Sequence, residues 1–248
     1  SDAEKPVLCP VTLGFGNEYD LVECSRCGVM FVHPMPSDQV LATFYSAEYF
    51  DFERHKFEGR GRAFARAYLR GSPAGRFLDV GCATGFFLNG VMQQSGWEVA
   101  GVDIGESAVR FARAELGLDV RHGELTDAKF PSGHFSFIHV SNVLEHTREP
   151  HGVLRECRRH LAPGGVLFLS IPNGFVDARD LVQFYKDEGV PALSKSGHIF
   201  FFPERTLNLV IAEAGFEVLS AHTFGIRRGL RILGLYPRSG RWKRPYRS

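Results

Sequence analysis

The residues best suited to chemistry lie at positions 79–85, which read Asp-Val-Gly-Cys-Ala-Thr-Gly and follow a short apolar run. Glycines between a strand and a helix allow a sharp turn and let a ligand lie against bare backbone. The amide groups that begin the following helix would face that ligand. Asp103 stands 22 residues after Gly81 (103 − 81), where a carboxylate ending the next strand can accept hydrogen bonds from both hydroxyls of a ribose. We therefore expect a ligand that carries a ribose.

The spacing of the loop separates two classes of ribose ligand. A dinucleotide fingerprint reads G-x-G-x-x-G, whereas here Gly81 and Gly85 are separated by three residues, with Ala83 between them. Asp79 places an acid just before the turn, where it would repel a pyrophosphate but can help to anchor an ammonium group. A ligand with a ribose, an amino acid and no phosphate fits S-adenosylmethionine (SAM) better than NAD.

The elements that must position these residues alternate from residue 76 onward. Strands are expected at residues 77–80, 99–103, 118–121, 135–140 and 166–171. Helices are expected at residues 85–94, 106–116 and 150–161, with Pro-Gly-Gly at 163–165 ending the last one. Strands joined by such helices form right-handed crossovers, so the predicted fold is α/β with a doubly wound, mostly parallel, Rossmann-like sheet. Its ligand should lie beyond the carboxyl ends of the central strands.

With these motifs in order, residues 77–173 resemble the class I SAM-dependent methyltransferases. The matching segments are "FLDVGCATG", "VAGVDIGESAV", "GELTDAKFPSGHFSFIHVSNVLEHTREP" and "LAPGGVLFLSIPN". The resemblance implies that SAM is the cofactor and that the chain is an enzyme that transfers its methyl group. It also implies a set of cofactor-binding residues: Asp79, Gly81, Cys82 and Gly85 around the methionine moiety, Asp103 at the ribose, Ile104, Leu125 and Asp127 at the adenine, and Ser141 and Asn142 beside the sulfonium.

Two histidines are candidates for catalysis. Methyl transfer to a hydroxyl is helped by a general base, and the unperturbed pKa of histidine suits that task. His146, in the pair Glu145-His146, is the first candidate, although it can instead orient a helix. Asn142 and Leu144 leave this segment short of carboxylates, so no metal is expected there. His198 can be a base, a substrate contact or a structural residue.

Residues 1–36 are expected to form a zinc-ribbon-like hairpin. Cys24 and Cys27 form a C-x-x-C pair between two apolar runs, but Thr12 stands where Cys9 would need its partner. Structural zinc takes four ligands, so a fourth would come from elsewhere, with His33 the nearest candidate. This part resembles certain natural-product and sugar methyltransferases with an N-terminal zinc module. The alternative is a vestigial hairpin without metal.

The other segments surround the SAM-binding core, which is expected at residues 74–225. Residues 37–73 resemble a helical lid with aromatic residues at 44, 45, 49 and 50, which would exclude water from the site. Residues 226–248 form a basic C-terminal segment in which a last strand can lie near residues 230–235. Such a segment can contact phosphates or anionic lipid, or it can be a solvated end.

The composition of the chain bears on the class of protein, its location and its partners. The formal net charge is +1, and 44% of the 248 residues are hydrophobic, as in a globular protein. Five scattered cysteines, no leader sequence and no apolar run of about 20 residues favour a cytoplasmic protein. We expect a small-molecule acceptor, a secondary metabolite or sugar methylated on oxygen, with neither membrane nor nucleic acid as partner. The alternatives are an RNA or protein methyltransferase and a non-catalytic SAM-binding scaffold.

Overall fold

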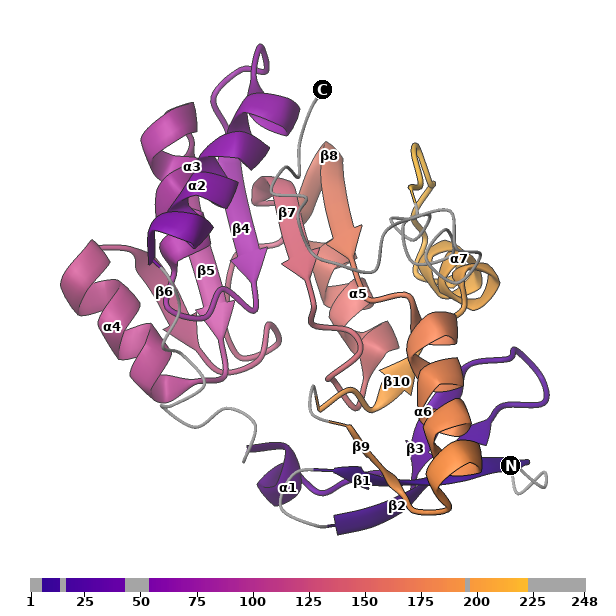
Figure 1. Ribbon diagram of the computed structural model, residues 1–248. Helices are drawn as coiled ribbons and strands as arrows, with labels where there is room; N and C mark the ends of the chain where they lie inside the picture. Colours follow the sequence, from indigo (N-terminus) through magenta and orange to yellow (C-terminus); the bar gives the residue numbers. More distant parts are fainter. Residues whose placement is uncertain (1–5, 14–16, 43–53, 195–196, 223–248) are drawn as a thin grey trace, which may run out of the picture. The chain divides into compact units, whose positions relative to one another are not determined.

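A computed structural model gives the structure of the chain and describes residues 6–13, 17–42, 54–194 and 197–222 (Figure 1). The chain divides into two compact units, Ser1–Phe216 and Glu217–Ser248. Every helix and strand of the described residues belongs to the first unit. In the second unit, the described residues 217–222 form no helix or strand. The basic segment 226–248 and the strand expected within it lie outside the described residues.

The first unit contains a five-stranded parallel sheet, which we call the core sheet. Its strand order is β6-β5-β4-β7-β8, and every neighbouring pair is parallel (Figure 1). Its strands are β4 (Arg76–Val80), β5 (Glu98–Asp103), β6 (Asp119–His122), β7 (Phe135–Ser141) and β8 (Leu161–Ser170). The chain runs outward from β4 to β6 and then returns to β7, so the order reverses between β4 and β7. The predicted α/β fold is confirmed, and folds with such a reversal bind their ligands at the carboxyl ends of the central strands.

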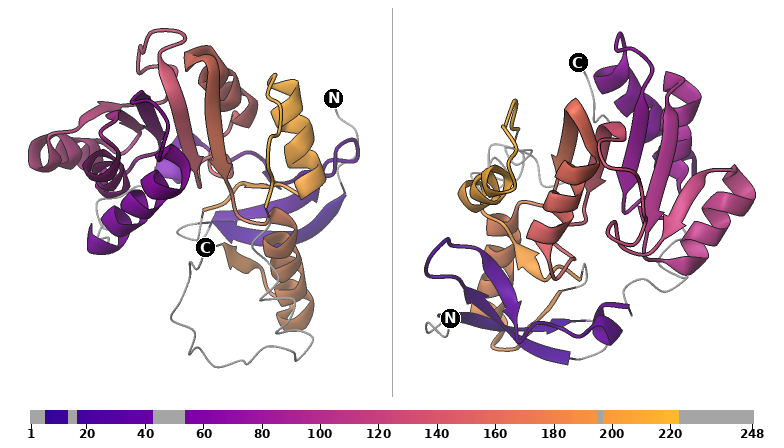
Figure 2. Two further views of the ribbon diagram at one scale, coloured as in Figure 1. Left: turned by 90° about the horizontal axis from the view of Figure 1, so that it is seen from above. Right: turned by 180° about the vertical axis from the view of Figure 1, so that it is seen from behind.

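Helices cover both faces of the core sheet (Figure 2). Phe77 of β4 packs in one buried cluster with residues of α3 and α4, and its neighbour Leu78 packs in another with Cys157 of α5. Successive strand residues point to opposite faces, so this division follows from the two-residue period of the strand. The helices are α3 (Phe86–Ser95), α4 (Glu106–Leu116) and α5 (Pro150–His160). They match the predicted helices to within one residue at each end.

One further helix, α2 (Arg54–Phe64), packs tightly on α3. A Cβ atom on Gly61 would overlap the backbone of Phe87, and one on Gly90 would overlap the backbone of Glu58. Beside this contact Asn89 Nδ2 donates a 2.8 Å hydrogen bond to Glu58 Oε1, both groups being buried. The chain continues as a π-helical turn, η3 (Ala65–Leu69). Glycines at the crossing therefore fix α2 and the residues that follow it against the core.

The connection from α5 to β8 differs from the prediction. The helix ends at His160, and β8 begins at Leu161, five residues before the predicted strand. Phe135 pairs with Leu161 but Phe137 pairs with Val166, so residues 162–165 bulge out of the ladder. The Pro-Gly-Gly sequence supplies the backbone freedom for this irregularity, because Gly164 has a φ of +74°. The triplet therefore lies inside the strand region instead of separating helix from strand.

The N-terminal strands belong to a second sheet, which we call the hairpin sheet, with the order β10-β3-β2-β1-β9. Strands β2 and β3 flank Cys24 and Cys27 and pair antiparallel, as predicted. Strands β9 and β10 come from far along the chain and were not predicted; β9 pairs parallel with β1, and β10 antiparallel with β3. The strands are β1 (Val7–Leu13), β2 (Asn17–Glu23), β3 (Met30–His33), β9 (Ala192–Ser194) and β10 (Phe200–Phe201).

The remaining helices of the described residues are α1 (Asp38–Ala42), α6 (Gly174–Glu188) and α7 (Glu204–Glu213). Asn173 caps α6, its Oδ1 accepting a hydrogen bond from the Val176 backbone at 3.3 Å. The aromatic positions expected in a lid, 44, 45, 49 and 50, lie outside the described residues. No helix in the described ranges is long and apolar enough to cross a membrane.

Candidate active site

The glycine-containing loop follows β4 at the carboxyl edge of the core sheet. Gly81 N and Cys82 N both donate to Val102 O of the neighbouring strand, at 2.8 and 3.2 Å. Gly81 has a φ of +74°, and a Cβ there would lie 2.5 Å from Val143 Cγ2. Gly85 has a φ of +76° and precedes the first residue of α3. Glycine is therefore required at both predicted positions, and Gly81 presents exposed backbone.

Asp103 ends β5 and holds this loop. Its Oδ2 accepts a 2.7 Å hydrogen bond from Ala83 N, and its Oδ1 accepts a 2.8 Å bond from Gly105 N. The side chain is buried, and this burial raises the pKa of the carboxyl group, although the two backbone donors lower it. Ala83 itself has a φ of +48°. The carboxylate thus fixes both the loop and the start of α4, at the place where a ribose was expected.

Asp79 has a partner that was not predicted. Its Oδ1 lies 2.7 Å from Nδ1 of His139 on β7, and both side chains are buried. The carboxylate can only accept in this bond, so Nδ1 carries the proton. No spacing in the sequence points to His139. The available signal was a histidine between the apolar residues Ile138 and Val140 of a buried strand.

The other predicted cofactor residues have different surroundings. Ile104 is 46% exposed directly after Asp103, so its apolar side chain is accessible to a ligand. Leu125 is 4% exposed and packs in the core. Asp127 is exposed, and its Oδ2 accepts a 3.3 Å bond from Glu124 N, which closes the turn after β6. Asn142 is exposed with a φ of +54° and follows the half-buried Ser141.

These residues fit SAM. Two carboxylates, Asp79 and Asp103, lie on either side of a loop whose Gly81 backbone is open, and Ile104 offers an apolar surface beyond them. A pyrophosphate would meet both negative charges, whereas an ammonium group and a ribose would each find an acceptor. Burial raises the pKa of the Cys82 thiol well above its usual range, which disfavours the thiolate form.

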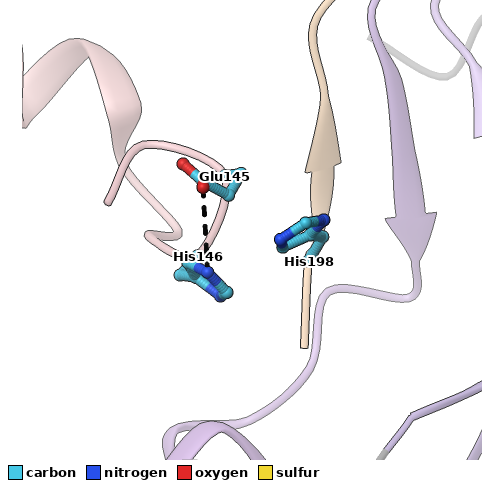
Figure 3. A group of neighbouring side chains, drawn as sticks. All are labelled: Glu145, His146 and His198. Carbon is cyan, nitrogen blue, oxygen red and sulfur yellow. Dashed lines mark ion pairs between the residues drawn. The ribbon is translucent and has the colours of Figure 1, made fainter. Parts of the chain in front are cut away.

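Three side chains meet beyond the carboxyl end of β7: Glu145, His146 and His198 (Figure 3). Nδ1 of His146 donates to Gly197 O at 3.2 Å, and its Nε2 lies 3.9 Å from Glu145 Oε1. The rings of His146 and His198 have centroids 4.9 Å apart. Nδ1 of His198 lies 3.8 Å from Asp177 Oδ2 of α6. Both predicted catalytic histidines therefore belong to one cluster.

Backbone hydrogen bonds bring these distant segments together. Glu145 O accepts from both Ile199 N at 2.8 Å and Phe200 N at 3.1 Å. Ile199 O in turn accepts from Val32 N of β3 at 3.0 Å. The loop after β7 is thus tied to the segment that leads into β10 and, through it, to the hairpin sheet. His198 is 52 residues from His146 in the sequence (198 − 146) and reaches it through this connection.

Burial controls the charge of the cluster. It raises the pKa of Glu145 to about 8, and within the described residues neither carboxyl oxygen of Glu145 has a hydrogen-bond partner. Burial lowers the pKa of His146, and it lowers that of His198 to about 4, with His146 contributing. Both imidazoles are therefore neutral at pH 7. The ligand atoms of the three residues lie within 4.8 Å of one another, so the cluster can pass a proton or share a divalent cation.

The predicted zinc ligands are only partly brought together. Cys24 and Cys27 lie at the turn between β2 and β3, and backbone N–H groups of Cys27 and Arg26 lower the pKa of the Cys24 thiol. Thr206 Oγ1 of α7 holds this turn by donating to Cys27 O at 2.5 Å. Cys9 is buried on β1, and burial raises its pKa to about 11. His33 ends β3 and is exposed. In the part of the chain that the structure describes, these residues do not form a close group of three ligands.

Comparisons with known proteins identify the family of the chain. A family model described as a methyltransferase domain matches residues 52–221. A Pseudomonas aeruginosa (strain LESB58) protein named ubiquinone biosynthesis O-methyltransferase is 32% identical over 161 residues, covering 62% of this chain and 68% of that protein.

Two crystal structures share the fold. One is of a SAM-dependent methyltransferase from Thermotoga maritima described as a possible histamine N-methyltransferase (TM-score 0.50, 23% identity, 66% of this chain and 74% of that one). The other is of a methyltransferase from Mesorhizobium loti (TM-score 0.53, 19% identity, 73% and 95%).

Proposed function

The chain belongs to the class I SAM-dependent methyltransferases, and we propose that it methylates a hydroxyl oxygen of a small molecule with His146 as the general base. The observation that carries this proposal is the orientation of His146. Nδ1 donates to Gly197 O, so the lone pair of the neutral ring is on Nε2. A base of this kind is what a hydroxyl acceptor needs, because it must lose its proton as its oxygen is methylated.

The cofactor supplies an electrophilic methyl group on a sulfonium. Asp79, Gly81, Cys82 and Gly85 would hold its methionine moiety, and Asp103 its ribose. Ile104, Leu125 and Asp127 would hold the adenine, with Ile104 on its face; Leu125 would take part through its backbone, because its side chain is buried in the core. Ser141 and Asn142 would close the pocket near the sulfonium.

The remaining task of the protein is to align and desolvate the acceptor oxygen. Nε2 of His146 takes the acceptor proton, and the ring becomes an imidazolium. Oε1 of Glu145 lies 3.9 Å from Nε2, beside the charge that develops. Because burial lowers the pKa of His146, the ring is in its basic form at pH 7. His198, also neutral, would contact the acceptor from the other side of the cluster.

The general base and the names of the relatives both support a hydroxyl group on a small molecule as the methyl acceptor. The curated relatives are named as O-methyltransferases of ubiquinone biosynthesis, which supports an oxygen nucleophile on a small molecule. We propose a secondary metabolite or a sugar with a free hydroxyl. The test is release of S-adenosylhomocysteine from SAM with matched phenols, sugars and amines. Turnover restricted to amines, or to RNA or protein, would refute it.

A second mechanism is favoured by one observation. Neither oxygen of Glu145 has a hydrogen-bond partner among the described residues, and His146 and His198 complete a set of three ligand atoms within 4.8 Å. A divalent cation there would satisfy Glu145 and lower the pKa of a bound hydroxyl itself. The two mechanisms differ in their response to chelation. With His146 as base, dialysis against EDTA leaves turnover unchanged; loss of turnover that Mg²⁺ or Mn²⁺ restores would favour the cation.

A further inference from the structure

The buried contact between Asp79 and His139 belongs to a row of side chains across three strands. Asp79 of β4 is in register with His139 of β7, which is in register with Phe168 of β8. Paired residues of parallel strands point to the same face, so the three side chains lie side by side. Asp79 lies two residues before Gly81, within the expected cofactor site. His139 therefore lies beside Asp79, a residue that we expect to bind the cofactor.

Aromatic rings fix the imidazole of His139. Phe87 of α3 stacks on it with centroids 4.5 Å apart and planes at 18°, and Phe168 stacks at 5.4 Å and 18°. Phe64 of α2 meets it edge-on at 5.0 Å. The ring is only 7% exposed, so it has little freedom to rotate. Its Nδ1 is consequently held at 2.7 Å from Asp79 Oδ1.

The two site carboxylates are oriented in different ways. Both oxygens of Asp103 accept hydrogen bonds from backbone N–H groups of the adjacent turns. Asp79 accepts through Oδ1 from a side chain of another strand. A carboxylate that is 4% exposed has little contact with water, so a hydrogen-bond donor in the protein fixes its orientation. The orientation of Asp79, unlike that of Asp103, thus depends on a side chain that can be replaced.

We infer that His139 is a positioning residue that holds the Asp79 carboxylate ready for the amino group of the cofactor. The inference rests on the proposed placement of the methionine moiety at Asp79. Nδ1–H of His139 engages Oδ1 and leaves Oδ2 to accept from the ammonium. Without that donor, the buried carboxylate would lose its fixed orientation, and Oδ2 would no longer be directed at the ammonium. Binding of the ribose and adenine at Asp103 and Ile104 would be unaffected.

Two variants and two ligands separate this role from a structural one. In His139→Asn the amide nitrogen can take the place of Nδ1 and keep the bond to Asp79. In His139→Gln the amide lies farther from the backbone and loses that bond. S-adenosylhomocysteine carries the amino acid, whereas 5′-methylthioadenosine has the same nucleoside without it. Titration calorimetry of both ligands, with thermal unfolding of each variant alongside, requires no acceptor substrate.

We expect His139→Gln to weaken S-adenosylhomocysteine binding by about tenfold and to leave 5′-methylthioadenosine within about twofold of wild type. His139→Asn should restore S-adenosylhomocysteine to within about threefold of wild type. Equal loss of both ligands in His139→Gln, or no loss of either, would overturn the inference. Failure of the wild-type protein to bind S-adenosylhomocysteine would overturn the proposed function as well, so the two failures are distinguishable.

Discussion

Replacing Asp103 by asparagine tests the ribose site most directly. Asparagine preserves the size of the side chain and one acceptor, but its NH₂ group must face the N–H of either Ala83 or Gly105, which now donate at 2.7 and 2.8 Å. Leaving one buried donor unpaired costs about 1–3 kcal/mol. Burial also raises the pKa of Asp103, because it disfavours the charged form, so removing the charge offsets part of the cost of the unpaired donor. We expect the free energy of unfolding to fall by about 1–2 kcal/mol.

The effect on ligand binding should be larger. A hydrogen bond from a ribose hydroxyl to a charged acceptor contributes about 1.5–3 kcal/mol, and each 1.4 kcal/mol is about tenfold in affinity. Asp103→Asn should therefore weaken S-adenosylhomocysteine binding by about 10- to 100-fold in titration calorimetry. The matched control is Glu106→Gln, which removes an exposed carboxylate paired with Arg110 at the start of α4. That control should change neither stability nor affinity by more than about 0.5 kcal/mol.

Wild-type affinity in a folded Asp103→Asn protein would refute the ribose assignment. Equal losses in Glu106→Gln would show that negative charge near this edge, and not a specific acceptor, is responsible. Thermal unfolding of all three proteins, measured with and without ligand, separates a damaged loop from a damaged contact. If the loop is damaged, the free energy of unfolding measured without ligand falls by as much as the free energy of ligand binding.

Three further predictions concern the cluster and the cysteines. His146→Gln should lower kcat by about 10²- to 10⁴-fold and remove the acid limb of the pH profile of kcat. Because burial lowers the pKa of His146, the acid limb of the wild-type enzyme should lie below the usual histidine range. An acid limb above that range would contradict the assignment of His146 as the base. Glu145→Gln should stabilise the fold increasingly as pH rises: the folded pKa is raised from 4.5 to about 8, so the cost of ionising the buried group is absent below the lower value and complete above the higher one. A difference between the unfolding midpoints of wild type and variant that does not widen between these pH values would refute that burial cost. Metal analysis should find well below one zinc per chain, because of the four expected ligands only Cys24 and Cys27 share a turn; stoichiometric zinc would require ligands from beyond the described residues.

Much of the fold could be predicted because its signals are local. The apolar runs at Phe77 and Val99 and the helical periodicity between them are properties of neighbouring residues. Strands β4 to β7 and helices α3 to α5 begin within one residue of the predicted positions. The start of β8 was wrong because strand pairing overrides local sequence there. Leu161 joins the ladder through its partner Phe135, despite the Pro-Gly-Gly that follows it. Strands β9 and β10 are too short to be recognised without the sheet that they extend.

By itself, the sequence determined the loop that we propose holds the cofactor. Gly81, Gly85 and Asp103 could be read from the chain because a turn between strand and helix imposes its backbone angles on a few consecutive residues. Only the tertiary structure decided which side chains surround that loop. His139 reaches Asp79 because two strands pair in register, and His198 reaches His146 because backbone hydrogen bonds join Glu145 to the segment before β10. Contacts between residues about 50 or 60 positions apart depend on the register and packing of whole elements, and no local pattern records them.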